Sequence, residues 1–152
     1  MPYYEDLELG EKYTTPGRTI TDGMASILVS VGGYAAEFFN NEEVANKTVA
    51  LKWRTIPGRV AFMIMGGLVE TYGARQPRQT EGNIVNAGCR DLRHKAPLRV
   101  GDTVYLESER IELTETSNPF WGRCIDRETL INQRGEVVIT ADVVHLYERR
   151  PK

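Results

Sequence analysis

The chain has 152 residues, a formal net charge of −2 and 26% charged residues of both signs. This length predicts one domain, residues 1–152, which can bury about 68–70% of its unfolded surface. The lack of a basic stripe excludes a nucleic-acid partner. The two cysteines show no CxxC spacing, and the chain starts with acidic residues and no apolar signal segment. These features predict a reduced, cytoplasmic protein. We expect no metal, no cofactor and no membrane partner.

The first part of the chain predicts a short strand followed by helices. Residues 12–20 carry Tyr, Thr and a Pro-Gly step, which predicts a short, interrupted edge strand. Thr21 and Asp22 are N-cap candidates for a helix that ends at Gly32-Gly33. The apolar positions of this helix recur at helical spacing: Met24, Ile27, Leu28 and Val31. Asn40 and Asn41 predict a turn or cap before one or two helical turns.

The most apolar stretch, residues 60–69, predicts the helix around which the rest of the chain folds. Nearly every position is apolar all the way round a helical wheel, and such a helix must be buried. The run is far shorter than the roughly 20 apolar residues that span a membrane. Pro57 suits a first turn and Gly73 a stop, so we expect one helix from about residue 59 to residue 72. The Gly66-Gly67 pair predicts that another backbone packs closely against this helix.

A polar loop at 75–82 separates this helix from a strand-rich second half. Four runs rich in Val, Ile, Thr and aromatic residues follow, at 83–92, 102–113, 120–132 and 136–147. The last two join through a short Gly-containing loop, which is typical of a hairpin. Helices in the first half and antiparallel strands in the second predict an α+β domain, in which a curved sheet covers the buried helix.

A sheet rolled around a buried helix is the hot-dog fold, and several motifs resemble one branch of it. The opening residues 4–21, Gly58-Arg59-Val60-Ala61 at the helix start, and the segments 97–103 and 132–137 resemble the MaoC-like acyl-thioester hydratases in order and spacing. The resemblance implies a hydratase or dehydratase, a lyase, that acts on an acyl-CoA or acyl-carrier-protein thioester. It also implies a homodimer with edge-to-edge pairing and an acyl tunnel at the subunit boundary.

The catalytic pair of these hydratases is missing. They use an Asp and a His five residues apart to activate a water, and a helix-start N–H to polarise the thioester carbonyl. In this sequence the Asp falls on residue 33 or 34 and the His on residue 38 or 39, which are Gly, Tyr, Phe and Phe. At the position of the His that usually opens the central helix, this chain has Phe62, and the next residue is Met63. Each acid–base group contributes about 10²–10⁴-fold, so we expect poor hydration of crotonyl-CoA and similar substrates.

Two titratable side chains remain in the altered segment, Tyr34 and Glu37. Beside Phe38 and Phe39, Glu37 could lie in an apolar pocket that favours its protonated form, and Tyr34 could donate a hydrogen bond to a carbonyl. Tyr34 and Glu37 are therefore the candidate catalytic residues. The candidate substrate-binding residues are Phe38, Phe39, Arg59, Phe62 and Met63. The alternative is that Tyr34 and Glu37 are loop residues without a role.

Both histidines have a structural interpretation. His94 lies at a strand end between two basic residues, which predicts exposure, whereas His145 lies among apolar residues, which predicts a satisfied, partly buried imidazole. Five basic residues could contact coenzyme A phosphates, although solvated charges explain them more simply: Arg75, Arg78, Arg93, Lys95 and Arg99. Two other functions stay open, a thioesterase in which Glu37 activates water, and a catalytically silent subunit that binds an acyl ligand or pairs with an active homologue.

Overall fold

The computed structural model describes residues 1–48, 50–75 and 82–151. Most of the predicted polar loop, residues 76–81, lies outside this range. The helices are η1 (Tyr4–Asp6, a 3-10 turn), α1 (Asp22–Val31), α2 (Glu37–Asn40), α3 (Glu42–Lys47) and α4 (Gly58–Arg75). The strands are β1 (Lys12–Thr14), β2 (Arg18–Thr19), β3 (Ile84–His94), β4 (Thr103–Glu115), β5 (Trp121–Asn132) and β6 (Val137–Glu148). Among these helices, none has the length and apolarity that crossing a membrane requires.

All of the described strands belong to one antiparallel sheet, in the order β1-β4-β5-β6-β3, with β2 pairing with the start of β4. The four long strands confirm the four predicted runs. The hairpin between β5 and β6 is also confirmed: Asn132 N–H donates to Glu136 O at 3.0 Å, and Gly135 has the left-handed φ of 76° that this tight turn needs. The interrupted first strand appears as β1 and β2.

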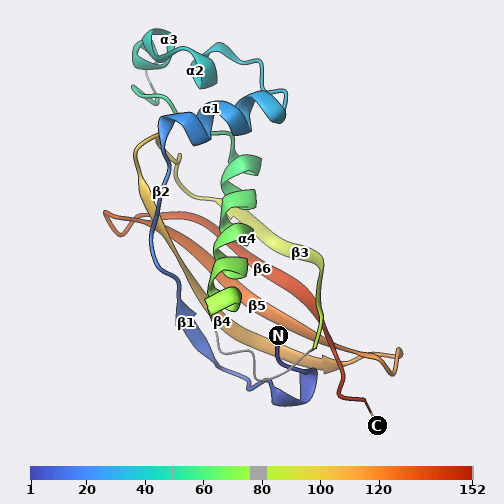
Figure 1. Ribbon diagram of the computed structural model, residues 1–152. Coiled ribbons are helices and arrows are strands. Elements are labelled where there is room, and N and C mark those ends of the chain that lie inside the picture. Colours follow the sequence, from blue (N-terminus) through green and yellow to red (C-terminus); the bar gives the residue numbers. More distant parts are fainter. Residues whose placement is uncertain (49, 76–81, 152) are drawn as a thin grey trace.

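The sheet curls around α4, while α1, α2 and α3 gather at one end of the molecule (Figure 1). One face of α4 packs on the concave side of the sheet and forms the core with the inward-facing apolar side chains of β4, β5 and β6. The buried positions of α4 are Val60, Ala61, Ile64, Met65 and Leu68. This arrangement is the hot-dog fold, and the predicted α+β class and central helix are confirmed.

The prediction that α4 is buried on every side is wrong. The side chain of Met63 is 54% exposed and Gly66 is exposed, because the sheet covers only one face of the helix. The close backbone contact predicted at the glycine pair is also wrong. A Cβ at Gly66 would have no neighbour within 4 Å, and at Gly67 it would meet only the guanidinium of Arg18, at 3.7 Å. The open face of α4 is therefore available for contact.

Helix α1 begins as predicted, because Thr21 Oγ1 accepts a hydrogen bond from Met24 N–H at 3.3 Å. Its buried face agrees only in part with the predicted one, since Met24 and Leu28 pack against the core but Ile27 and Val31 do not. Ala25 and Val29 are fully buried, whereas Ile27 and Val31 are 64% and 83% exposed. The helix contacts the core through a narrow stripe centred on its small residues, so two large apolar side chains remain at the surface.

Candidate functional site

The first turn of α4 is the centre of the candidate site. An extended segment before it is tied to the sheet, since Ile56 N–H donates to Leu98 O at 3.0 Å. The first helical hydrogen bond runs from Ala61 N–H to Pro57 O. The N–H groups of residues 58–60 therefore have no acceptor within the helix and carry the positive end of its dipole. Backbone donors in this arrangement can stabilise a developing oxyanion.

The imidazole of His94 lies directly on this turn. A Cβ added at Gly58 would be 2.7 Å from His94 Cε1 and 2.9 Å from His94 Nδ1, so any larger residue would require the ring to move from this position. Leu92 packs against the core, and His94, two residues later on β3, lies on the same inner face of the sheet. His94 remains exposed to solvent, as predicted. The sequence contains no local signal for this contact, because β3 and α4 are far apart in the chain.

The predicted aromatic residues of the altered segment do come together. The rings of Tyr34 and Phe39 meet edge to face with their centroids 6.0 Å apart, and those of Phe38 and Phe39 are 4.2 Å apart. Tyr34 is partly buried and packs against the hydrophobic core. The amide of Asn40 holds this segment by donating hydrogen bonds to Tyr34 O at 2.9 Å and Ala36 O at 3.2 Å.

Glu37 does not lie in the apolar pocket that the sequence predicts. It is exposed in the single chain, on the first turn of α2. The reason is the position of α2, which pairs with α3 at the end of the molecule beyond α1 (Figure 1). The turn between the two helices is capped by Asn41, whose Oδ1 accepts from Glu43 N–H at 3.0 Å. Desolvation of Glu37 would require a second molecule.

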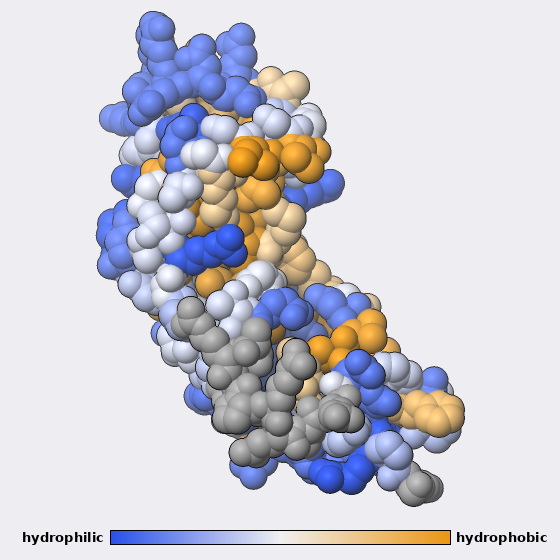
Figure 2. All heavy atoms as spheres, in the orientation of Figure 1, coloured by the Kyte–Doolittle hydropathy of each residue, from blue (hydrophilic) through white to orange (hydrophobic). Residues whose placement is uncertain are grey.

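The predicted substrate-binding residues of α4 differ in exposure. Phe62 is partly buried and packs on the core, whereas Arg59 and Met63 are exposed. Hydrophobic side chains gather on the surface at the α1 end of the molecule, beneath a hydrophilic tip (Figure 2). An accessible apolar surface therefore accompanies the start of the central helix.

Two of the five proposed phosphate-binding cations, Arg99 and Arg93, have other partners. The guanidinium of Arg99 stacks on the Trp53 ring, 3.3 Å from its centroid, and Arg93 lies 3.7 Å from the carboxylate of Asp91. The Arg78 position lies outside the described residues, and so does the side chain of Arg75. These contacts favour the simpler interpretation, in which the described cations are surface charges.

A second group of ionisable residues lies inside the sheet, where the sequence predicted only a partly buried His145. Arg110 Nε is 3.2 Å from Asp126 Oδ1 and 3.2 Å from Cys124 Sγ. His145 Nε2 is 3.6 Å from Glu128 Oε1 and 3.9 Å from Asp126 Oδ2. All five side chains are buried, so we name them the buried polar layer.

Burial favours the protonated forms of two residues of this layer, Glu128 and Cys124. It raises the pKa of Glu128, and together with the Asp126 charge it raises the pKa of Cys124 to about 12, which leaves an unreactive thiol. His145 Nδ1 has no hydrogen-bond partner among the described residues, so the prediction of a satisfied imidazole is wrong at this atom. Because the layer is enclosed, it contributes to the structure of the core and not to a substrate site.

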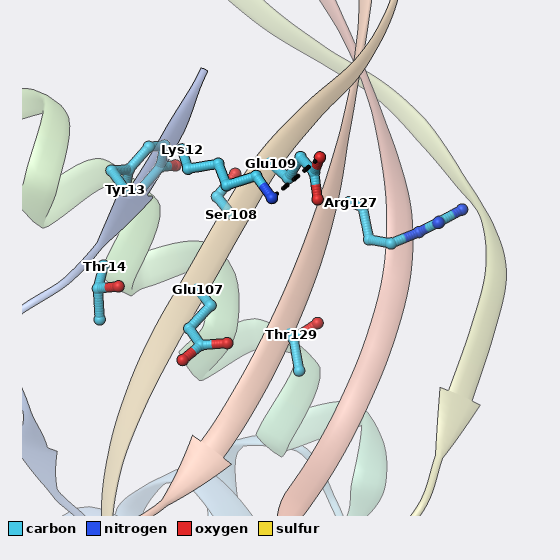
Figure 3. Close-up of a pocket in the computed structure, with 8 residues that line it drawn as sticks. All are labelled: Lys12, Tyr13, Thr14, Glu107, Ser108, Glu109, Arg127 and Thr129. Atoms are coloured by element: carbon cyan, nitrogen blue, oxygen red, sulfur yellow. Dashed lines mark ion pairs between the residues drawn. The ribbon is translucent and has the colours of Figure 1, made fainter. Parts of the chain in front are cut away.

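A polar groove of about 450 Å³ lies along β1, β4 and β5 (Figure 3). Lys12 Nζ and Glu109 Oε1 face each other across it at 3.3 Å. Its two cations are balanced by two glutamates, so it offers no net charge to a phosphate. Its lining residues are Lys12, Tyr13, Thr14, Glu107, Ser108, Glu109, Arg127 and Thr129. No group of three or more His, Cys, Asp or Glu side chains within the described ranges is arranged to hold a metal ion.

The fold is similar to several solved structures. A monoamine oxidase regulatory protein from Archaeoglobus fulgidus superposes with a TM-score of 0.86 at 24% identity, over 99% of this chain and 96% of that one. A MaoC-like dehydratase from Rhodospirillum rubrum gives 0.80 at 23% identity, over 100% of both chains. The R-hydratase PhaJ1 from Pseudomonas aeruginosa gives 0.74 at 22% identity, over 97% and 86%. No family model and no curated protein matches the sequence. At these identities the similarity establishes the fold alone, and the reaction must be inferred from the residues of the site.

Proposed function

We propose that the chain is a diverged MaoC-like hydratase or dehydratase that acts on an acyl-CoA or acyl-carrier-protein thioester. The observation that carries the proposal is the open first turn of α4 at Gly58, next to an accessible apolar surface. The motif resemblance and the fold shared with a MaoC-like dehydratase and an R-hydratase support it. Two free cysteines fit a reduced, cytoplasmic setting.

Hydration of an enoyl thioester needs a place for negative charge and a route for one proton. When the oxygen of water bonds to C3, the electrons of the C2–C3 double bond move toward the thioester oxygen. The N–H groups at the start of α4 are suited to that oxygen, and one such donor is worth about 2.7–4 kcal/mol. The acyl chain would lie along Phe38, Phe39, Phe62 and Met63, and Arg59 would face the phosphates of the carrier.

Tyr34 and Glu37 have secondary roles in this proposal. The hydroxyl of Tyr34, at the edge of the aromatic cluster, would donate a hydrogen bond to the bound acyl group. Glu37 would act at the entrance of the acyl-binding site, where a partner subunit would shield it from solvent. Exposure of Glu37 in the single chain makes its role depend on the dimer.

A homodimer is the second part of the proposal. Strand β3 is an edge of the sheet, and nearly all of its residues are exposed. Unpaired backbone groups on an edge of this length favour pairing with another strand. The exposed apolar side chains of Ile27, Val31 and Met63 would be covered in the same association.

The test is an assay of purified protein with 2-enoyl-CoA substrates of increasing chain length. Hydration is followed by the ultraviolet absorbance of the conjugated thioester, and binding is measured by calorimetry. We expect binding with slow turnover. Binding without turnover would indicate a silent acyl-binding subunit, and release of free coenzyme A would indicate a thioesterase. Failure to bind any acyl thioester would contradict the proposal.

A further inference from the structure

The chain has two histidines, and only one of them is accessible. His145 is 6% exposed and lies in the buried polar layer, where its Nε2 faces two carboxylates. His94 is exposed at the end of β3. If an imidazole takes part in the reaction proposed above, the accessible one must supply it.

The end of β3 is shaped so that His94 meets the helix start. A β-bulge lies between Arg90 and Arg93, and Asp91 inside it adopts a left-handed φ of 52°. Bulges bend a strand and redirect its side chains, and they are over-represented next to active sites. After the bulge, Lys95 N–H donates to Val138 O at 2.9 Å, which holds the strand end in the sheet.

Gly58 has no side chain, which leaves room for the His94 ring at the start of α4. The ring atoms Cε1, Nδ1 and Nε2 of His94 all lie between 2.7 and 3.0 Å from the position that a Cβ would occupy. A proton-transferring group thus sits beside the N–H groups suited to a thioester oxygen. Both parts of the chemistry, the oxyanion donors and an acid–base group, meet on one exposed turn.

We propose that His94 is the catalytic acid–base residue of this chain and replaces the missing Asp/His pair. This inference rests on the proposed hydratase function. His94 accepts a proton from water while the water oxygen bonds to C3 of the enoyl thioester. The electron pair of the double bond moves to the thioester as an enolate, and the imidazolium returns the proton to C2. One water is added, and the enzyme ends in its starting state.

The first experiment compares His94→Ala and His94→Gln with wild type in the enoyl-CoA assay. Loss of one acid–base group should lower kcat about 10²–10⁴-fold while the Kd for the thioester changes little. Added imidazole should restore part of the turnover of His94→Ala and leave wild type unchanged. Lys12→Ala, in the polar groove that Figure 3 shows, is the control and should keep wild-type kinetics. Circular dichroism verifies that each variant is folded.

The second experiment does not require turnover. Protein labelled in its histidine rings gives two imidazole signals by NMR, and the His94→Gln spectrum assigns them. Butanoyl-CoA, which is saturated and cannot be hydrated, should move the His94 signal and leave the His145 signal in place. Wild-type kcat in both His94 variants, or an unmoved His94 signal with thioester bound, would overturn this inference alone. Absence of thioester binding to wild type would overturn the proposed function and this inference with it.

Discussion

His145 Nε2 lies 3.6 Å from Glu128 Oε1 inside a sheet whose neighbouring core positions are apolar. Along the same strands, Leu106 pairs with Leu130, and Leu130 pairs with Ile139. The inward-facing side chains of β5 therefore change from aliphatic at Leu130 to ionisable at Glu128, two residues away. Buried charges pay a desolvation cost that only good pairing offsets, so the stability of this half of the sheet must depend on protonation.

The first prediction concerns Glu128→Gln. Burial raises the pKa of Glu128 in the folded chain, so the unfolded chain loses this proton at a lower pH. The free energy of unfolding of wild type should fall as the pH rises from about 4.5 to the raised pKa, by about 1.4 kcal/mol per unit of pKa difference. Glu128→Gln should lack this fall. Urea unfolding between about pH 4 and 7 measures it, and a wild-type stability that rises relative to the variant over this range would contradict it.

Asp102→Asn should show the opposite pH dependence. Desolvation disfavours the Asp102 charge, but Arg134 at 2.7 Å, Gln133 at 2.9 Å and the Arg99 N–H at 3.0 Å outweigh it and lower the pKa. The stabilisation is present above about pH 4 and is lost as the pH falls through the lowered pKa. At neutral pH the variant should lose about 1–3 kcal/mol.

The acid titration supplies the check for Asp102. The stability difference from wild type should disappear as the carboxyl is protonated, and a difference that stays constant to the acid limit would count against the assigned network. Glu8→Gln is the matched control, because Glu8 is an exposed carboxylate. It should leave stability within about 0.5 kcal/mol of wild type.

A matched pair of substitutions on α4 tests which face the sheet covers. Met65 is fully buried and Met63 is 54% exposed. Met65→Asp places an unpaired carboxylate in the core. A typical domain is stabilised by only about 5–15 kcal/mol, so this cost should prevent folding. Met63→Asp should leave the chain folded, with a cost of less than about 1 kcal/mol to the single chain, although it places a charge in the proposed dimer contact. Similar thermal melting of the two variants would show that the helix face is misplaced.

Two glycines of α4 make a second matched pair. Gly66→Ala has free space and should raise the free energy of unfolding by about 0.8–1.0 kcal/mol. Gly58→Ala must push the exposed His94 ring away from its preferred rotamer, which should cost about 0.5–1.5 kcal/mol. Combining Gly58→Ala with His94→Ala should remove most of this cost, and additive effects in the double-mutant cycle would mean that the two residues do not touch.

The proposed dimer predicts a molar mass near twice 17.2 kDa by light scattering at micromolar concentration. Val85→Lys places a charge at a 46% exposed position of the β3 edge and should lower this mass, because charged edge strands resist pairing. Glu8→Gln, at an exposed carboxylate outside β3, is the control and should leave the mass unchanged. A monomer mass for wild type would remove the dimer from the proposal.

The sequence alone predicted the central helix, the four long strands, the hairpin at Gly135 and the cap at Thr21. These features depend on residues close together in the chain: the period of apolar positions, turn residues and caps. The aromatic cluster of Tyr34, Phe38 and Phe39 could also be predicted from the sequence, because its members lie within six residues of one another.

Only the tertiary structure decided which faces are covered and which distant residues meet. Met63 is exposed and Glu37 reaches solvent because the sheet and α1 cover limited areas, which no local pattern states. The buried polar layer depends on strand register, since a shift of one residue would turn Glu128 outward. His94 meets Gly58 because pairing with β6 and a β-bulge carry the end of β3 to the start of α4. Such contacts form between segments with no sequence relationship, so they follow from packing and not from periodicity.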